Sequence, residues 1–204
     1  MKTVAIVDYG MCNLDSVARA VQECGGVPLV TDDSKALATA NSIVLPGVGA
    51  FGVGIKNLRD RGLEQPLREQ VLEKGIPFLG ICLGMQLLAK RGEEHGGAEG
   101  LGWLDAETVL IKTAPGERLP HIGWNEVRPA RESRLFAGID SGTDFYFVHS
   151  YALRPRDPAV ALASAPYGDG VCAAVQKDNV YGVQFHPEKS QKAGFTLLRN
   201  FLSL

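Results

Sequence analysis

The stretch PFLGICLGMQLL, residues 77–88, places a single cysteine between a short apolar run and an amphipathic run of helical period. The first run has the length of a β-strand, and Gly80 and Gly84 stand two residues to either side of Cys82. Small residues there permit a sharp strand-to-helix turn that holds the central side chain in a cleft. A helix N-terminus at that point favours a thiolate over a thiol. The stretch predicts a nucleophilic cysteine, with a buried structural cysteine as the alternative.

Strand-like and helical runs alternate on both sides of this stretch. Apolar, β-branched runs occupy residues 4–7, 27–30, 43–45 and 78–81, and runs with helical spacing occupy residues 14–24, 34–40, 55–74 and 83–90. Largely apolar strands are typical of parallel sheets that are covered on both faces. The rhythm predicts an α/β fold with a doubly wound, mostly parallel sheet and ligands at the carboxyl ends of its strands.

The second half of the chain has a different pattern of residues. From about Leu101, shorter β segments separated by glycine and proline occupy residues 107–112, 126–128 and 144–148, and we expect antiparallel additions. A β-rich run at residues 171–183 and a final helix at residues 191–202 follow. No repeat or linker is visible, so we expect a single domain over residues 1–204. Residues 91–97 are expected to form a mobile surface loop in which His95 is solvated.

The segment VQFHPEKS, residues 183–190, supplies a candidate base for the cysteine. His186 and Glu188 are two residues apart, which places both side chains on one face of an extended chain. Pro187 favours that extended geometry. A carboxylate beside an imidazole fixes its tautomer and stabilises its protonated form. Alone the segment also fits a strand-end turn with a solvated acid, but with Cys82 it predicts a nucleophile, a base and an orienting group.

A third segment, SIVLPGVGAF at residues 42–51, reads as a buried strand that ends in a glycine-rich strap. Attack by a cysteine on an acyl group creates an oxyanion, which backbone N–H groups stabilise. We expect one donor from Leu83, directly after the cysteine, and a second from Val48 or Gly49. The alternative for this strap is an ordinary turn between a strand and a helix.

Together these segments resemble the class I glutamine amidotransferases, which use a Cys-His-Glu triad. The shared segments are PGVG at 46–49, GICLGMQ at 80–86 and FHPE at 185–188. Within the family, further segments resemble the glutaminase subunit of imidazole glycerol phosphate synthase: DYG at 8–10 with Asn13, LPHIGWNEV at 119–127, FVHSY at 147–151 and QFHPEKS at 184–190. The resemblance covers nearly the whole chain. Two departures are Cys12, where members usually carry glycine, and Cys172, where an aromatic residue is expected.

The resemblance implies an enzyme that hydrolyses L-glutamine to glutamate and ammonia. In this interpretation Cys82 attacks the carboxamide and forms a thioester, His186 transfers the proton, and Glu188 orients His186. The family uses no metal or organic cofactor. The ammonia would pass to a separate cyclase subunit with a (β/α)₈ barrel fold, which makes imidazole glycerol phosphate in histidine biosynthesis, so that the two chains form a heterodimer.

The resemblance also implies further site residues. Glutamine would be held by Gly49, by the amide of Gln86 and by the backbone of Ser150 and Tyr151. Alternatively, Gln86 is an ordinary residue on a helix surface. For His149 we favour a structural role as a hydrogen-bonded residue over a role as a second base. The segment with Trp124 and Asn125 would face the cyclase.

Other functions remain as alternatives. Within the enzyme class these are the amidotransferase subunit of another synthase and a free γ-glutamyl hydrolase. The alternative outside it is a catalytically silent binding module on the same fold, against which the three triad residues argue.

Composition limits the function in other ways. The 204 residues include 21 basic and 23 acidic side chains, a balance that gives no reason to expect binding to nucleic acid or a membrane. The four cysteines form no C-x-x-C pair, which argues against a zinc site and for a reducing compartment. No long apolar span is present, so we expect a cytoplasmic protein.

Overall fold

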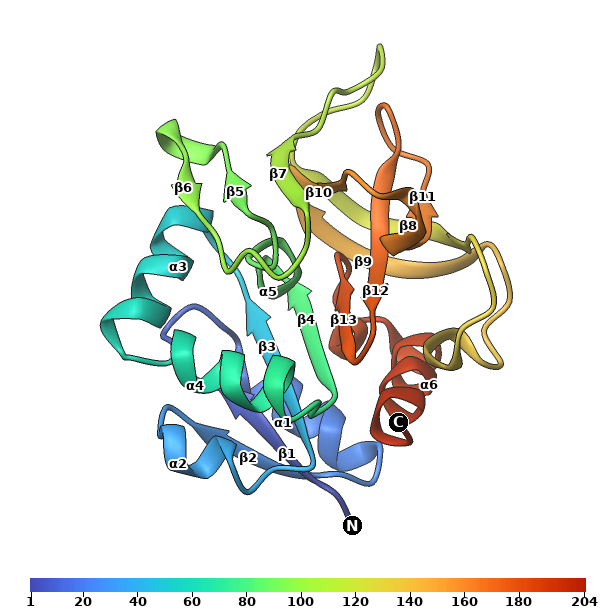
Figure 1. Cartoon of the computed structure of the whole chain (residues 1–204). Helices are drawn as coiled ribbons and strands as arrows, with labels where there is room; N and C mark the ends of the chain where they lie inside the picture. Colours follow the sequence, from blue (N-terminus) through green and yellow to red (C-terminus); the bar gives the residue numbers. More distant parts are fainter.

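A nine-stranded sheet organises the computed structural model, which describes residues 1–204 (Figure 1). Its strand order is β2-β1-β3-β4-β13-β12-β11-β8-β9, and the first five of these strands are parallel. The parallel strands are β2 (Val27–Thr31), β1 (Thr3–Val7), β3 (Ser42–Gly47), β4 (Phe78–Cys82) and β13 (Val180–Val183). The antiparallel strands are β12 (Val171–Lys177), β11 (Ala161–Ala165), β8 (His121–Pro129) and β9 (Thr143–His149).

A second, four-stranded sheet has the order β10-β7-β5-β6. Its strands are β10 (Tyr151–Pro155), β7 (Ala106–Leu110), β5 (Arg91–Gly92) and β6 (Ala98–Glu99). The helices are α1 (Leu14–Glu23), α2 (Ser34–Leu37), α3 (Phe51–Asp60), α4 (Glu64–Arg68), α5 (Leu83–Gln86) and α6 (Gln191–Leu202). The π-helical turn η1 (Glu69–Glu73) follows α4, and the 3₁₀ turns are η2 (Glu94–Gly96), η3 (Arg134–Phe136), η4 (Pro158–Val160) and η5 (Pro187–Lys189).

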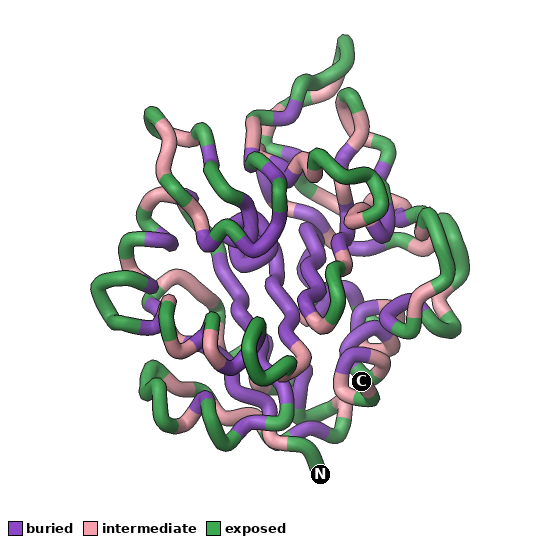
Figure 2. Tube along the Cα trace, in the orientation of Figure 1, coloured by how far each residue is buried: buried purple, intermediate pink, exposed green.

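The parallel half of the sheet is buried on both faces, because its residues alternate between two hydrophobic cores. Val4 and Ile6 of β1 belong to the core that includes the apolar faces of α1 and α6. Ala5 and Val7 belong to the core on the other face, with α3 and α4. Figure 2 shows these central strands as continuous buried segments surrounded by exposed turns. The doubly wound architecture that the sequence predicts is therefore confirmed.

Three predicted helices have different bounds. The helix expected over residues 34–40 ends at Leu37. The helix expected over residues 55–74 begins at Phe51 and ends at Asp60, where Gly62 turns the chain with a φ of +67° before α4. The helix expected over residues 83–90 ends at Gln86. There the carbonyl of Gln86 accepts a hydrogen bond from Thr108 Oγ1 at 3.1 Å, and the N–H of Lys90 donates to Ala106 instead. Contacts with β7 thus end the helix after one turn.

The antiparallel additions are confirmed, but they divide between two sheets. β8, β9, β11 and β12 extend the parallel strands, whereas β7 and β10 pair with each other in the smaller sheet. The expected surface loop at residues 91–97 contains β5 and η2, and the prediction is wrong for Glu94, whose side chain is 17% exposed. His95 is exposed, as expected.

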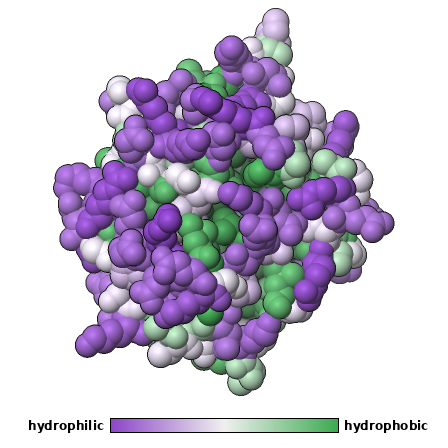
Figure 3. Space-filling view, viewed as in Figure 1, coloured by the Kyte–Doolittle hydropathy of each residue, from purple (hydrophilic) through white to green (hydrophobic).

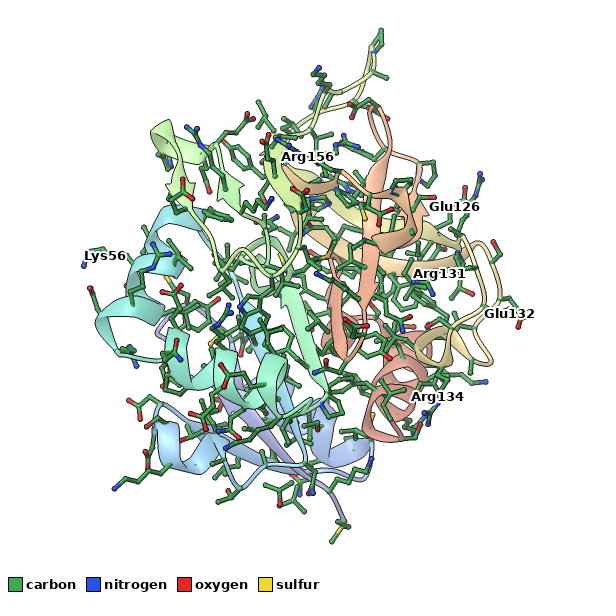
Figure 4. The ribbon with its side chains drawn as sticks, viewed as in Figure 1. Lys56, Glu126, Arg131, Glu132, Arg134 and Arg156 are labelled. Atoms are coloured by element: carbon green, nitrogen blue, oxygen red, sulfur yellow. The ribbon has the colours of Figure 1, made fainter.

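Charged side chains cover the outside of the molecule. Figure 4 shows the labelled Lys56 on α3 and Glu132 in the loop after β8 at opposite sides of the molecule, and both residues are exposed. Hydrophilic residues dominate the face in Figure 3, with apolar residues gathered in small areas between them. None of the helices has both the length and the apolar character that a membrane span requires.

Candidate functional site

Cys82 lies at the junction of β4 and α5 with an unusual backbone. Its φ is 53° and its ψ −107°, a conformation that residues with a side chain rarely adopt. The turn is packed so closely that only glycine fits at the two flanking positions. A Cβ on Gly84 would overlap the carbonyl of Leu45, and a Cβ on Gly80 would lie 2.6 Å from the carbonyl oxygen of Gly84. The two glycines that flank Cys82 in the sequence thus let the turn press against β3. The predicted strand-to-helix turn is present (Figure 1).

His186 and Glu188 lie beside Cys82 because β13 pairs in parallel with β4. Val183 is opposite Ile81, so the chain leaves β13 at the same edge of the sheet where β4 ends. His186 Nδ1 is 2.7 Å from Glu188 Oε1, and each of these two side chains is 3% exposed. Ser190 fixes the turn, since its hydroxyl donates to the carbonyl of His186 at 2.6 Å.

The environment of His186 favours a protonated imidazole. Burial lowers its pKa, but interactions with the Cys82 thiol and the Glu188 carboxylate outweigh burial and raise the pKa above its ordinary value. Nδ1 is bonded to Glu188, while Nε2 is buried and makes no hydrogen bond. The free nitrogen is therefore the one available to exchange a proton with the thiol.

A cavity of about 400 Å³ opens onto the cysteine. Its size suits a small molecule such as an amino acid. The strap after β3, the turn after Cys82, and the segment between β9 and β10 form its walls. The lining residues are Val48, Gly49, Ala50, Cys82, Leu83, Gln86, Glu94, Pro120, Val148, His149, Ser150 and Tyr151.

The strap places its backbone donors differently from the sequence prediction. The N–H of Val48 donates to the carbonyl of Met11 at 2.6 Å, so this conformation does not offer Val48 as an oxyanion donor. The N–H of Gly49 makes no hydrogen bond within the chain. The pairing of Gly47 with Cys82 at the end of the β3–β4 ladder directs the N–H of Leu83 to the carbonyl of Gly47. One of the three expected donors is thus free, and the other two are held by Met11 and by Gly47.

The expected glutamine-binding residues meet in the cavity, but several of their polar groups are already used. Gln86 is 6% exposed, and its Nε2 donates to the carbonyl of Tyr151 at 2.8 Å and to Gln184 Oε1 at 3.1 Å. Its Oε1 alone remains for a ligand. The carbonyl of Ser150 accepts the N–H of Ile111 at 3.0 Å. A ligand beside this segment therefore meets N–H groups rather than carbonyls.

Trp124 and Asn125, both expected to face a partner, differ in exposure. Trp124 is 49% exposed and lies edge-on to Tyr146, with ring centroids 6.0 Å apart. Asn125 points inward: its Nδ2 is 3.2 Å from His121 Nε2 and 3.3 Å from the carbonyl of Pro166. Trp124 is thus available for docking, whereas the side chain of Asn125 is a structural link.

That link belongs to a chain of buried hydrogen bonds. His121 Nδ1 lies 3.0 Å from His149 Nε2, and His149 Nδ1 lies 2.8 Å from the carbonyl of Tyr151. Because Tyr151 offers only an acceptor, His149 carries its proton on Nδ1 and accepts from His121. Burial lowers the pKa of His121 to about 4 and that of His149 to about 3, so both are neutral. The structural role predicted for His149 is confirmed.

Sequence reasoning missed Glu94 and Gln184. The Glu94 carboxylate lines the cavity, where Oε2 accepts the N–H of Phe51 at 2.8 Å. Gln184 Nε2 lies 3.6 Å from Cys82 Sγ. Gln184 precedes His186 by two residues, so the alternation that paired His186 with Glu188 also points to it. No local pattern identifies Glu94.

The other cysteines are poor nucleophiles. Burial, followed by the charge of Asp8, raises the pKa of Cys12 to about 11. Burial raises the pKa of Cys172 to about 12 and, more moderately, that of Cys24. All four cysteines are free thiols. Cys12 and Cys172 therefore differ from their expected counterparts without adding a second reactive site.

Known proteins resemble this chain over almost its full length. Residues 5–203 match the family described as glutamine amidotransferase class-I. The imidazole glycerol phosphate synthase subunit HisH of Moorella thermoacetica is 48% identical over 202 residues, which are 98% of this chain and 94% of that protein. The HisH subunit of Aquifex aeolicus is 47% identical over 203 residues, covering 98% and 96%.

Solved structures agree in fold at lower identity. The structure of PurLQS from Thermotoga maritima superposes with a TM-score of 0.76 at 20% identity and covers 100% of this chain and 99% of that one. A crystal structure of a glutamine amidotransferase superposes with a TM-score of 0.75 at 21% identity, covering 98% and 97%.

Proposed function

The chain belongs to the class I glutamine amidotransferase family, and from this premise we propose that it is the glutaminase subunit of an imidazole glycerol phosphate synthase. It hydrolyses L-glutamine and delivers ammonia to a cyclase in histidine biosynthesis. The observation that carries the proposal is the Cys82 turn, which lines the cavity and lies beside the His186–Glu188 pair, whose Nδ1 and Oε1 atoms are 2.7 Å apart.

We assign the chemistry to three side chains. His186 Nε2 takes the proton of Cys82, and the sulfur forms a bond to the carboxamide carbon of glutamine. The tetrahedral intermediate collapses to a thioester, while the imidazolium gives its proton to the leaving nitrogen and ammonia departs. Water then attacks the thioester with His186 as base, and glutamate and the thiol are released. Glu188 holds the imidazole by Nδ1 throughout.

The conformation of the strap in this structure is an argument that the isolated chain has low glutaminase activity. The N–H of Gly49 is free to bind the oxyanion, but Val48 is turned toward Met11 and the N–H of Leu83 faces the carbonyl of Gly47. Loss of a single oxyanion donor costs about 10²–10³-fold in kcat in other enzymes. If docking of the cyclase releases the Val48 N–H from Met11, the oxyanion site is complete only in the complex. The isolated chain then hydrolyses little glutamine when no cyclase is present to use the ammonia.

Recognition of glutamine follows from the groups that remain free in the cavity. Gln86 Oε1 is an acceptor, and the N–H groups at Ser150 meet the α-carboxylate. Glu94 provides the carboxylate for the α-ammonium group, because it lines the cavity with Oε2 held by the N–H of Phe51 and Oε1 only 3.7 Å from the exposed His95 Nε2. Gly49 lets the strap approach the substrate closely.

The relatives are named as subunits of a synthase, which supports a second chain as partner. We assign the docking surface to β8, where Ile122 and Trp124 are 59% and 49% exposed. Exposed large apolar side chains on one strand are typical of an interaction surface. The partner that this surface fits is the cyclase subunit, with a (β/α)₈ barrel fold.

The test separates the supply of ammonia from its use. Cys82→Ala removes the nucleophile and one sulfur, so the fold and the surface around Trp124 are retained. The complex of this variant with the cyclase is expected to lose glutamine-driven synthesis by at least about 10⁴-fold. Synthesis driven by ammonium salts at alkaline pH is expected to stay at the wild-type level.

Cys24→Ala is the matched control, because Cys24 follows α1 beside the carbonyl of Phe195 and is not among the residues that line the cavity, so its variant should retain both activities. Glutamine-driven synthesis by the Cys82→Ala complex would contradict the mechanism. Absence of ammonia-driven synthesis with the cyclase would instead contradict the assignment of the partner.

A further inference from the structure

Tyr9 has a buried hydroxyl that the mechanism does not use. The residue follows β1, its exposure is 0%, and its Oη makes no hydrogen bond. Burial, with smaller contributions from Cys12 and Cys82, raises its pKa well above the ordinary value, so the hydroxyl keeps its proton and is a donor. Buried polar groups are nearly always paired, and an unpaired one at a functional site calls for an acceptor.

The hydroxyl lies against the backbone of the strap. A Cβ added to Gly47 would overlap Tyr9 Oη. The main chain of Tyr9 is anchored as well, because its carbonyl accepts a hydrogen bond from Asn57 Nδ2 at 3.0 Å. Since the ring is enclosed in the core with α3 and α5, the hydroxyl has no route to solvent and stays beside Gly47.

The peptide group between Gly47 and Val48 can adopt two opposite orientations. A peptide group is planar, with its C=O and N–H on opposite sides. Its N–H now points to the carbonyl of Met11 at 2.6 Å, in the loop that follows Tyr9. If the peptide turns and presents the Val48 N–H to the cavity, the Gly47 carbonyl turns toward the loop after β1. A buried carbonyl there needs a donor.

We propose that Tyr9 is a positioning residue whose hydroxyl donates to the Gly47 carbonyl in the active arrangement of the strap. The inference rests on the proposed function, because it concerns the donor that Val48 adds to the oxyanion site. In the resting arrangement Met11 is bonded and Tyr9 is unpaired. In the active arrangement Tyr9 is bonded, and Val48 binds the oxyanion.

The exchange keeps the two arrangements close in free energy. On turning, the Val48 N–H leaves Met11 for the oxyanion, and the Gly47 carbonyl leaves the Leu83 N–H that it faces at the end of the β3–β4 ladder for the Tyr9 hydroxyl. Each lost hydrogen bond is replaced, so a modest contribution from a docked partner is enough to shift the population. Without the hydroxyl, the turned Gly47 carbonyl is buried and unpaired, and the resting arrangement gains in population.

The experiment compares Tyr9→Phe with the wild type in the ratio of glutaminase activity with the cyclase and imidazole glycerol phosphate to activity of the chain alone. We expect the ratio to fall about three- to tenfold, the effect of one hydrogen bond, through kcat and not through KM for glutamine. Melting of the free variant should occur at the same or a higher temperature than the wild type, because an unpaired buried group has been removed.

Tyr181→Phe is the matched control. Tyr181 is 7% exposed, packs against Phe201 on the other side of the sheet, and loses only a 3.3 Å hydrogen bond from Gln176. Its ratio should equal that of the wild type. An unchanged ratio for Tyr9→Phe, or a melting temperature below the wild type's, overturns the role of Tyr9. A wild-type chain without any stimulation by the cyclase contradicts the proposed function itself.

Discussion

At the scale of single residues, the site depends on one strained backbone and one buried pair. The positive φ of Cys82 costs about 1–3 kcal/mol, which the packing of the turn must offset. The helix after it is a single turn, Leu83–Gln86, so the macrodipole that the sequence predicts is short and weak. Activation of the thiol therefore falls mainly to His186, whose protonated form Glu188 stabilises.

The role of Glu188 is open to a direct test. Glu188→Gln keeps the shape of the side chain but removes the charge that stabilises the imidazolium, and its amide NH₂ allows the other tautomer of His186 as well. We expect kcat to fall by about 10³–10⁴-fold, less than in Cys82→Ala or His186→Ala, because an orienting group does less than a nucleophile or a base. Glu132→Gln, an exposed residue in Figure 4, is the control and should have wild-type kinetics. Equal losses in all three triad variants would contradict this role.

Residue patterns in the sequence predicted the side chains of the site better than its backbone. Cys82, His186 and Glu188 are found from spacing, because the constraints on them are local. The direction of the Val48 N–H depends on Met11, 37 positions earlier, and Glu94 enters the site through a contact with Phe51, 43 positions earlier. No pattern within a short window encodes such contacts.

At the scale of elements, the turn after β4 is held by the strand beside it. β3 and β4 pair in parallel up to Gly47 and Cys82, so the strap and the nucleophile leave the sheet together. Gly84 allows α5 to rest on the carbonyl of Leu45. The position of Cys82 relative to the strap is thus a property of the two-strand unit and not of either loop alone.

Substitution of Gly84 tests this packing. A Cβ at Gly84 meets a backbone carbonyl that cannot move without disturbing β3, so Gly84→Ala should lower the free energy of unfolding by about 2–4 kcal/mol and reduce glutaminase activity. Gly52→Ala in α3 is the control: its Cβ would lie 3.7 Å from Ala98, and the change should stabilise the protein by about 0.5–1 kcal/mol. Urea unfolding measures both. A Gly84→Ala protein as stable as Gly52→Ala would refute the close contact.

Elements were predicted well where their causes are local. The four parallel strands of the first half were found within two residues of their observed ends, because apolar runs bounded by polar residues define them. The early end of α5 was missed, because it follows from Thr108 on another sheet. The second sheet was missed for the same reason, since the pairing of β7 with β10 joins residues that are 41 (Tyr151 and Leu110) to 49 (Pro155 and Ala106) positions apart.

At the scale of the whole molecule, the stability below neutral pH depends on two of the buried histidines, His121 and His149. The pKa of His149 is lowered to about 3 and that of His121 to about 4, whereas the unfolded chain titrates near 6.5. A lowered pKa means that the unfolded state binds protons first as the pH falls. The associated stability is complete above pH 6.5 and is lost as the pH falls toward the folded pKa values.

The measurement is urea unfolding between pH 7 and pH 4.5. The wild type should lose stability over this range, and His149→Gln should lose about 1–3 kcal/mol less, because one proton no longer distinguishes the two states. His95→Gln is the control, since the His95 side chain is 81% exposed and should leave the pH dependence unchanged. The same slope in His149→Gln and the wild type would show that His149 titrates normally.

The place of β13 in the sheet has a consequence for the newborn protein. β13 lies between β4 and β12, and it is made about a hundred residues after β4. While a ribosome extends the chain at about 5–20 residues per second, β4 remains an open edge for at least several seconds. During that time Cys82 has neither His186 nor Glu188 beside it. Ammonia release therefore begins only once synthesis has passed residue 188, and a nascent chain, although exposed to aggregation at that edge, consumes no glutamine.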